Sequence, residues 1–235
     1  MGVSSNLELF PIPVNVGTLG EASRELNKQL IVDSFDAINT TPTEMRSGIN
    51  ITQTVSTLET QYESFGKLQD IITDYVKPVI KWAGTHNTDI QAEFFWCNIN
   101  NRRDAFHMPH SHQIDGYLWT GVYFPSSGIL NGKELADDQN LDELVSIESR
   151  TQPKPGSLVL EDPIHFVKQA IATKKTDRYP FWGNPICIEP KAGTIVLFPT
   201  YLPHLVTPTE KDDFLRVSIA FYVRVHTGNG GIDKT

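Results

Sequence analysis

The chain has few cysteines, a deficit of basic residues and no long apolar run. Two of its 235 residues are cysteines, Cys97 and Cys187, and neither lies in a Cys-x-x-Cys pair, so no disulfide framework is expected. Twenty basic and 28 acidic residues give a net charge of −8, which disfavours nucleic acid or an acidic membrane as a partner. No segment approaches the roughly 20 apolar residues of a membrane span, and no signal peptide is visible. We therefore expect a cytoplasmic protein that acts on a small-molecule or protein substrate.

The composition is 39% hydrophobic and 20% charged, as in ordinary globular proteins rather than disordered ones. A chain of this length forms one sizeable domain more readily than two. We predict a single domain over residues 1–235, with a mostly helical layer at 1–89, a β core at 90–226 and a loose tail at 227–235.

Apolar residues at helical spacing predict two helices in the first third of the chain. The segment 20–38 carries Leu26, Leu30, Ile31, Phe35 and Ile38 on this pattern. The segment 58–83 repeats it over a longer stretch, with Pro78 as a candidate bend.

From residue 90 onward the sequence pattern changes to short runs of β-branched and aromatic residues separated by turn-forming residues. These runs are IQAEFFWCNI, YLWTGVYF, SLVLE, PICIE, GTIVLF, HLVT and FLRVSIAFYVRV. Helices followed by many short strands predict a jelly-roll core, also called a cupin-like double-stranded β-helix, with the helices packed on its major sheet. The acidic stretch 131–156 is expected to be a surface insertion between strands.

Residues 106–116, FHMPHSHQIDG, contain three of the seven histidines. In an extended chain His110 and His112 project from one face with Cβ atoms roughly 6 to 7 Å apart. Two imidazoles at that spacing can bind one metal ion. His107 is three residues from His110, so we expect it to face away, and its use stays open.

A third histidine and an arginine lie far along the chain, in PTYLPHLVTPTEKDDFLRVSIAFYV. A hairpin centred on Glu210 would pair His204 with Arg216, which would place both side chains on one face. Alternation along the last strand puts Arg216 and Ser218 on one side and apolar residues on the other. A buried arginine needs an anionic partner, and a ligand carboxylate can supply it. Beside a metal ion, this arrangement suits a keto acid.

The same residues resemble the Fe(II)- and 2-oxoglutarate-dependent oxygenases, and in particular a family of such enzymes found in phages and marine bacteria. The matching segments are LFPIPV (9–14), FWCNIN (95–100), HSH (110–112), TGVYF (120–124), GTIVLFPTYLPHLVTP (193–208) and RVSIAF (216–221). The resemblance spans nearly the whole chain. It implies a double-stranded β-helix, Fe(II) and 2-oxoglutarate as cofactors, and a dioxygenase that hydroxylates its substrate and releases succinate and CO₂.

By position, the resemblance implies that His110 and His204 bind the metal, that Arg216 anchors the cosubstrate carboxylate and that Ser218 assists it. The wider superfamily has Asp or Glu two residues after the first histidine, whereas this chain has His112. Either His112 is the remaining ligand, giving an all-histidine set, or Asp115 reaches the iron, and the i, i+2 spacing favours His112.

Further cavity candidates are polar and aromatic residues on the predicted strands and in the insertion before the PICIE run. They are Asn98, Tyr117, Trp119, Tyr123 and Trp182. Ordinary core positions explain most of them, but Asn98 needs a polar partner, and we place Asn98 and Tyr123 at the cosubstrate.

Two other functions fit parts of this pattern. One is a cupin-like metalloenzyme that uses three histidines without 2-oxoglutarate, and the other is a non-catalytic jelly-roll interaction protein. An exposed sheet edge would also allow a homodimer.

Overall fold

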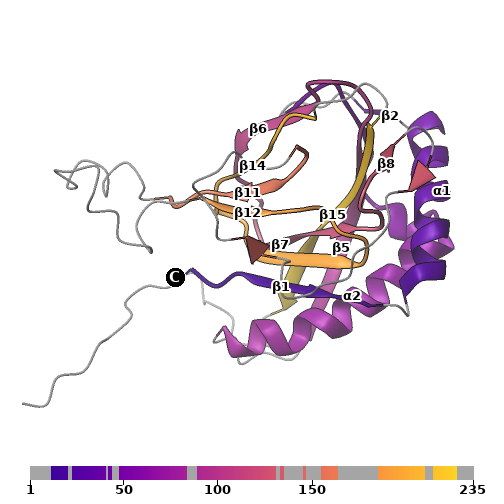
Figure 1. The fold of residues 1–235 in the computed structure, drawn as a ribbon. Helices are drawn as coiled ribbons and strands as arrows, with labels where there is room; N and C mark the ends of the chain where they lie inside the picture. The colour runs from indigo at the N-terminus through magenta and orange to yellow at the C-terminus, as the bar shows by residue number, and fades with distance from the viewer. Residues whose placement is uncertain are drawn as a thin grey trace, which may run out of the picture.

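The computed structural model describes most of the chain (Figure 1). The described residues are 12–20, 23–40, 42–43, 48–83, 89–130, 133–134, 145–146, 155–163, 185–209 and 214–226. Trp182, most of the 131–156 stretch, the tip of the expected hairpin at 210–213 and the tail at 227–235 lie outside these residues.

Two α-helices form where the apolar periodicity predicts them. They are α1 (Arg24–Thr40) and α2 (Glu63–Trp82), with a 3₁₀ helix at Leu58–Thr60 before α2. The buried apolar side chains of α2 recur every three or four residues, from Phe65 to Ile80, and so form one face. Pro78 lies within α2. Among the described residues, neither helix is long and apolar enough to cross a membrane.

The rest of the described chain is mainly strand. The strands are β1 (Asn15–Thr18), β2 (Pro42–Thr43), β3 (Gly48–Ile49), β4 (Ile51–Thr54), β5 (Asp89–Asn100), β6 (Phe106–His110), β7 (Tyr117–Phe124), β8 (Ile129–Leu130), β9 (Lys133–Glu134), β10 (Val145–Ser146), β11 (Leu158–Leu160), β12 (Ile186–Ile188), β13 (Thr194–Pro199), β14 (His204–Val206) and β15 (Phe214–His226). Each of the seven predicted runs is a strand, which confirms a mainly β fold with two helices.

The strands form two antiparallel sheets that face each other (Figure 1). Residues of both sheets line one cavity. The larger sheet has the order β1-β13-β7-β15-β5-β4-β2, and the smaller sheet has the order β10-β12-β11-β14-β6-β3. Many neighbouring strands are distant in sequence, such as β1 and β13 or β6 and β14, as in a jelly-roll.

The larger sheet also uses strands from the segment expected to be helical. β1 pairs with β13, and β4 pairs with β5. The sheet therefore begins well before residue 90. These strands are only four residues long, too short to give a clear alternating pattern.

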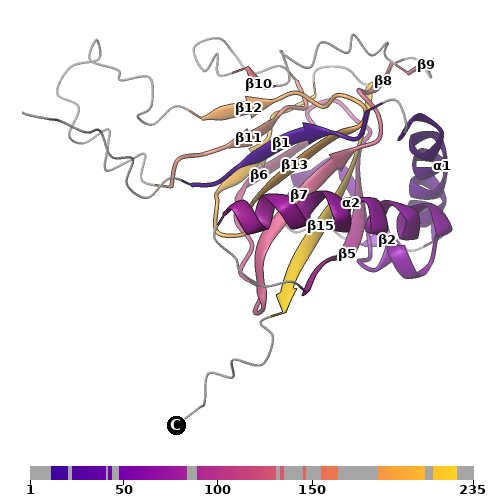
Figure 2. The ribbon, with the colours of Figure 1, turned by 90° about the horizontal axis from the view of Figure 1, so that it is seen from below.

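Helix α2 runs across the strands of the larger sheet (Figure 2), and buried residues of both helices share one core with residues of this sheet. The outward residues of β15, including Val217, Ile219 and Phe221, are fully buried in the core between this sheet and the helices. Burying each such side chain contributes roughly 1.5 to 3 kcal/mol. The inward residues of β15 are thereby fixed toward the cavity. Cys97 and Cys187 are both buried and free, as expected.

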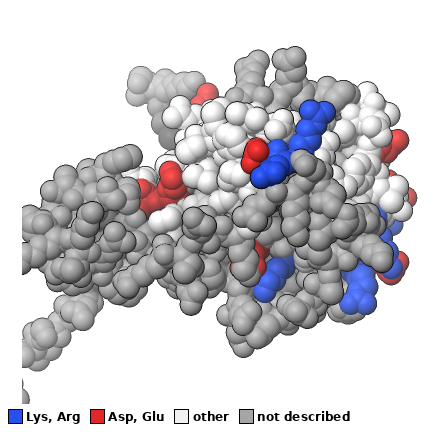
Figure 3. Space-filling view, turned by 45° about the horizontal axis from the view of Figure 1, so that its top comes forward, with Lys and Arg blue, Asp and Glu red and all other residues white. Residues whose placement is uncertain are grey.

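Among the described residues, charged side chains are sparse on the face shown in Figure 3. The described basic side chains there lie in small groups next to acidic ones rather than in one continuous patch.

Candidate active site

A cavity of about 340 Å³ lies between the two sheets. Its described lining is Gln53, Ser56, Trp96, Asn98, His107, His110, His112, Ile114, Thr120, Val122, Leu158, Phe198, His204, Val206, Arg216, Ser218, Ala220 and Tyr222. None of these residues is an aspartate or a glutamate. The cavity thus combines imidazoles, one guanidinium, neutral polar groups and apolar side chains.

Three imidazoles meet in this cavity. His110 is the last residue of β6, and His112 lies in the loop that follows. His204 is the first residue of β14, the strand that pairs with β6. One nitrogen from each ring lies within 4.8 Å of those from the other two. Donor atoms at this separation can hold one metal ion, since metal–nitrogen bonds are about 2.0 to 2.1 Å long.

The second nitrogen of each ring is already engaged. Nδ1 of His110 donates to the carbonyl of Met108 at 2.7 Å, and Nδ1 of His204 donates to that of Leu202 at 2.9 Å. Nδ1 of His112 shares a 2.9 Å hydrogen bond with the Tyr222 hydroxyl. These contacts orient the rings and leave Nε2 of all three for a metal ion.

The electrostatics favour neutral imidazoles. Burial, reinforced by His110, lowers the pKa of His112 to about 4 and that of His204 to about 3. Both rings are therefore unprotonated at neutral pH, which is the form that binds metals.

His107 also points into the cavity, so the expectation that it faces away is wrong. His204 pairs with His110, and Val206 pairs with His107, so three steps on β6 match two on β14. The extra residue in this β-bulge, next to Pro109, brings His107 and His110 to the same face. His107 is 6% exposed, and its Nε2 has no hydrogen-bond partner. Burial and the charge of Arg216 lower its pKa well below the usual value.

Arg216 lies on the inward face of β15 and is 1% exposed. One guanidinium nitrogen donates to the Ser218 hydroxyl at 2.9 Å, and the group lies 5.0 Å from the centre of the Phe124 ring. Nε has no partner, and no described carboxylate forms an ion pair with it. Burial lowers the pKa of Arg216 to about 9, so it stays cationic at neutral pH. A buried cation without an anion is costly and indicates a ligand-binding position.

Arg216 and His204 do not form the expected hairpin pair. β14 pairs with β11 and β6 in the smaller sheet, whereas β15 pairs with β5 and β7 in the larger one. The two residues still line the same cavity, because each lies on the inner face of its own sheet. The shared space was predicted, but through the wrong pairing.

Residues 94–222 match the model of a family described as "Putative 2OG-Fe(II) oxygenase". The chain belongs to this family. A search of curated proteins found no matching sequence.

Solved structures resemble this oxygenase over nearly its whole length. A prolyl-4-hydroxylase from Pseudomonas putida is 15% identical, with 92% of this chain and 94% of that chain covered and a TM-score of 0.55. A prolyl hydroxylase from Trichoplax adhaerens, solved with a peptide fragment, is 12% identical, with 91% and 84% covered and a TM-score of 0.54. HygX from Streptomyces hygroscopicus, solved with nickel and 2-oxoglutarate, is 10% identical, with 91% and 83% covered and a TM-score of 0.53. At these identities the likeness concerns the fold.

The donor set of this oxygenase suits its family's cofactors, Fe(II) and 2-oxoglutarate. Three imidazoles can bind the metal, and the unpaired Arg216 faces the same cavity. Asn98, predicted at the cosubstrate, lines the cavity too, and its side-chain oxygen has no partner.

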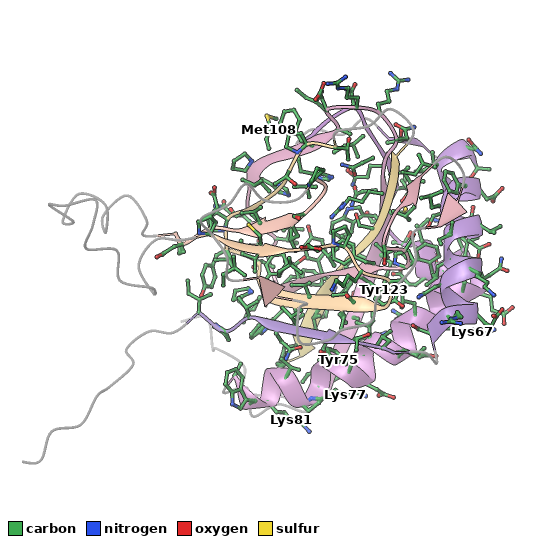
Figure 4. The ribbon with its side chains drawn as sticks, viewed as in Figure 1. Lys67, Tyr75, Lys77, Lys81, Met108 and Tyr123 are labelled. Atoms are coloured by element: carbon green, nitrogen blue, oxygen red, sulfur yellow. The ribbon has the colours of Figure 1, made fainter. Side chains whose placement is uncertain are left out.

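Other predicted residues of the oxygenase lie elsewhere. Tyr123 faces the helices and donates a 2.5 Å hydrogen bond to Asn27 of α1, so its predicted place at the cosubstrate is wrong (Figure 4). Trp119 belongs to the same helix-side core. Residues two apart on a strand share a face, and Thr120 and Val122 occupy the cavity side instead. Asp115 is exposed and outside both the lining and the histidine group.

The sequence interpretation missed several lining residues, among them Trp96, Tyr222, Gln53 and Ser56. Trp96 contacts the His112 and Tyr222 rings edge-on or tilted, and Tyr117 packs against Tyr222 from outside the lining. Gln53 and Ser56 reach the cavity from β4 and the turn after it. Tyr222 lies six residues after Arg216 on the same strand, so strand alternation could have placed it on the cavity face. Gln53 and Ser56 could not be placed without knowing that β4 is a strand of the larger sheet.

Proposed function

We propose that this oxygenase binds Fe(II) through His110, His112 and His204. Arg216, helped by Ser218, holds the distal carboxylate of 2-oxoglutarate. The reaction is hydroxylation of a small-molecule or protein substrate, with succinate and CO₂ as co-products. The observation that carries this proposal is the shared cavity, in which three imidazoles within metal-binding reach face a buried, unpaired arginine.

Each residue has a defined task in this reaction. Nε2 of each histidine binds the metal, while the engaged Nδ1 atoms hold the rings in place. Arg216 binds a carboxylate through its planar donors and fixes the orientation of the keto acid. When bound, iron and 2-oxoglutarate supply the oxygen chemistry. The surrounding apolar side chains, such as Val122, Leu158 and Phe198, exclude water from the site.

Asn98 and His107 are further contacts for the cosubstrate in this proposal. Both are buried beside Arg216, and each has a polar atom without a partner. We expect His107→Leu to weaken 2-oxoglutarate binding about tenfold, because one hydrogen bond to a charged ligand is lost. His107→Gln, which retains a side-chain N–H donor, should recover part of the affinity. Equal affinity for all three proteins would remove His107 from the cosubstrate site.

The substrate class follows from cavity size. A volume of 340 Å³ is near the lower end for ligand sites, so cosubstrate and metal leave space for a small molecule or one side chain of a protein. One similar structure holds a peptide, and HygX has also been solved with hygromycin B. We further propose that the chain acts as one domain, because both sheets line one cavity.

Anaerobic addition of Fe(II) and then 2-oxoglutarate tests the proposal. We expect a weak visible charge-transfer band in the wild type, and succinate formation once oxygen is admitted. His204→Ala should abolish the band because a metal ligand is lost. Well-folded wild-type protein that gives no band would contradict the assignment.

The all-histidine donor set also suits a cupin-like metalloenzyme that uses no keto acid. Arg216→Ala separates the two functions. It should suppress the 2-oxoglutarate band and succinate formation in the proposed enzyme, whereas a keto-acid-independent metalloenzyme would keep its turnover. Retention of metal binding by this variant is the control.

A further inference from the structure

The described cavity has no negative charge of its own. Its lining includes four histidines, one arginine and no carboxylate. Histidine binds a metal ion as the neutral imidazole, so the three-histidine group contributes no negative charge. Arg216 is the one fixed charge in this described lining, and it contacts a hydroxyl and an aromatic ring rather than an anion.

The cofactors do not balance this charge. Fe(II) brings two positive charges and Arg216 one, whereas fully ionised 2-oxoglutarate brings two negative charges. A site with one carboxylate ligand would be neutral under the same count. The three-histidine site retains one excess positive charge in a largely buried space, where an unbalanced charge is costly.

The cosubstrate leaves part of the cavity free, and a further anion bound there could provide the missing negative charge. Arg216, Ser218 and Asn98 take the distal carboxylate at the larger sheet in the proposed function. Gln53, which is paired with Asn98 across β4 and β5, and Ser56 add neutral polar side chains to the lining. Beside His112 the lining includes Trp96, whose ring contacts the His112 ring, and Ile114, two residues further along the chain. An additional anion placed there faces no negative side chain among the described residues.

We propose that the oxygenase binds a second anionic ligand, a small monoanion, next to the three-histidine group, in addition to 2-oxoglutarate. This inference rests on the proposed function and specifies its substrate class. The monoanion is either a carboxylate carried by the organic substrate or a free inorganic anion such as a halide. Both would supply the one negative charge that His112 does not.

Titration of the anaerobic Fe(II)–2-oxoglutarate complex with simple anions tests this inference. The probes are sodium formate, acetate, chloride and azide at constant ionic strength, and the readout is the shift of the charge-transfer band. Formamide is the uncharged match for formate. We expect saturable binding of at least one anion and at least tenfold weaker binding of formamide.

The probes also distinguish the two sources of negative charge. Binding of formate and acetate without chloride identifies an organic carboxylate, whereas binding of chloride and azide identifies an inorganic anion. Either result supports the inference. A complex that forms its band but responds to no anion overturns it and leaves the proposed function intact.

His112→Asp is the matched variant, since it supplies the missing carboxylate at the same position. Its complex with Fe(II) and 2-oxoglutarate should bind the monoanion at least tenfold more weakly than the wild-type complex does, because the excess charge is gone. Unchanged anion affinity in this variant would contradict the charge balance. If the variant binds no metal, the comparison of formate with formamide in the wild type decides. Absence of the band in the wild type itself would overturn the proposed function.

Discussion

At the scale of single residues, the site depends on polar groups that lack partners within the protein. Arg216 Nε, His107 Nε2 and Asn98 Oδ1 are all buried and unpaired. Most buried polar atoms in proteins have a partner, so several orphans in one cavity indicate a ligand with matching groups. Replacing such a residue by an apolar one should therefore preserve or raise the free energy of unfolding while it lowers the affinity for the ligand.

Arg216→Met provides this contrast. Methionine removes an unpaired buried charge, so we expect the metal-free variant to be at least as stable as the wild type in urea unfolding. Its 2-oxoglutarate affinity, measured in the presence of metal, should fall roughly a hundredfold. A destabilised variant with unchanged cosubstrate affinity would show that Arg216 is structural.

Tyr222→Phe tests how His112 is oriented. The variant loses the hydroxyl that contacts Nδ1 of His112, and such losses typically weaken metal binding about 10- to 100-fold. Competition with a chelator measures the affinity. Tyr117→Phe is the control, because the Tyr117 hydroxyl contacts Glu93 and Arg224 instead of a histidine. Equal metal affinity in wild type and Tyr222→Phe would remove this role.

At the scale of elements, two β-bulges shape the cavity wall. One is in β6 and brings His107 to the side of His110. The other is in β5, where Phe94 has a positive φ of 57°, opposite the shift between Ala220 and Tyr222 of β15. The Glu59 carboxylate accepts hydrogen bonds from the backbone N–H groups of Phe94 and Phe95, both at 3.0 Å.

Glu59→Gln should loosen the β5 bulge. An amide offers one oxygen where the carboxylate offers two, so we expect a loss of about 1 to 2 kcal/mol in the free energy of unfolding. Glu63→Gln is the control, since its exposed pair with Lys67 on α2 should not affect stability measurably. Equal stability of both variants would mean that the bulge does not need its carboxylate.

These bulges also explain where prediction from sequence stopped. Alternation placed Arg216 and Ser218 correctly, because β15 is long and one of its faces is uniformly apolar. The face of the sheet on which the His107 and Tyr123 side chains lie depends on strand register and on which sheet the strand joins. A one-residue shift in register moves a side chain to the opposite face. The pairing of β14 was wrong because a turn-rich segment predicts a chain reversal but does not say whether the next strand returns to the same sheet. The resemblance to the family implied the same candidate residues without depending on that pairing.

At the scale of the whole molecule, the candidate active site joins segments far apart in the chain. His110, His204 and Arg216 come from β6, β14 and β15, and the cavity exists only when both sheets are assembled. Ligands that bind across this cavity should stabilise the native state against global unfolding.

Thermal unfolding should therefore show coupling between the two cofactors. With a metal ion and 2-oxoglutarate each at a hundred times their dissociation constants, each contributes about 2.7 kcal/mol. We expect 2-oxoglutarate to raise Tm far more when Mn(II) is present than without it, because the keto acid binds partly through the metal. Succinate, which lacks the keto group, is the control ligand. Equal shifts with and without Mn(II) would contradict a shared site.

The most direct test of the central claim is a crystal structure with Mn(II) and 2-oxoglutarate bound under anaerobic conditions, with anomalous diffraction to locate the metal. The account predicts one metal peak about 2.0 to 2.3 Å from Nε2 of His110, His112 and His204, with the distal carboxylate of 2-oxoglutarate on Arg216. A metal bound elsewhere, ligation by Asp115 in place of His112, or a cosubstrate carboxylate distant from Arg216 would contradict it.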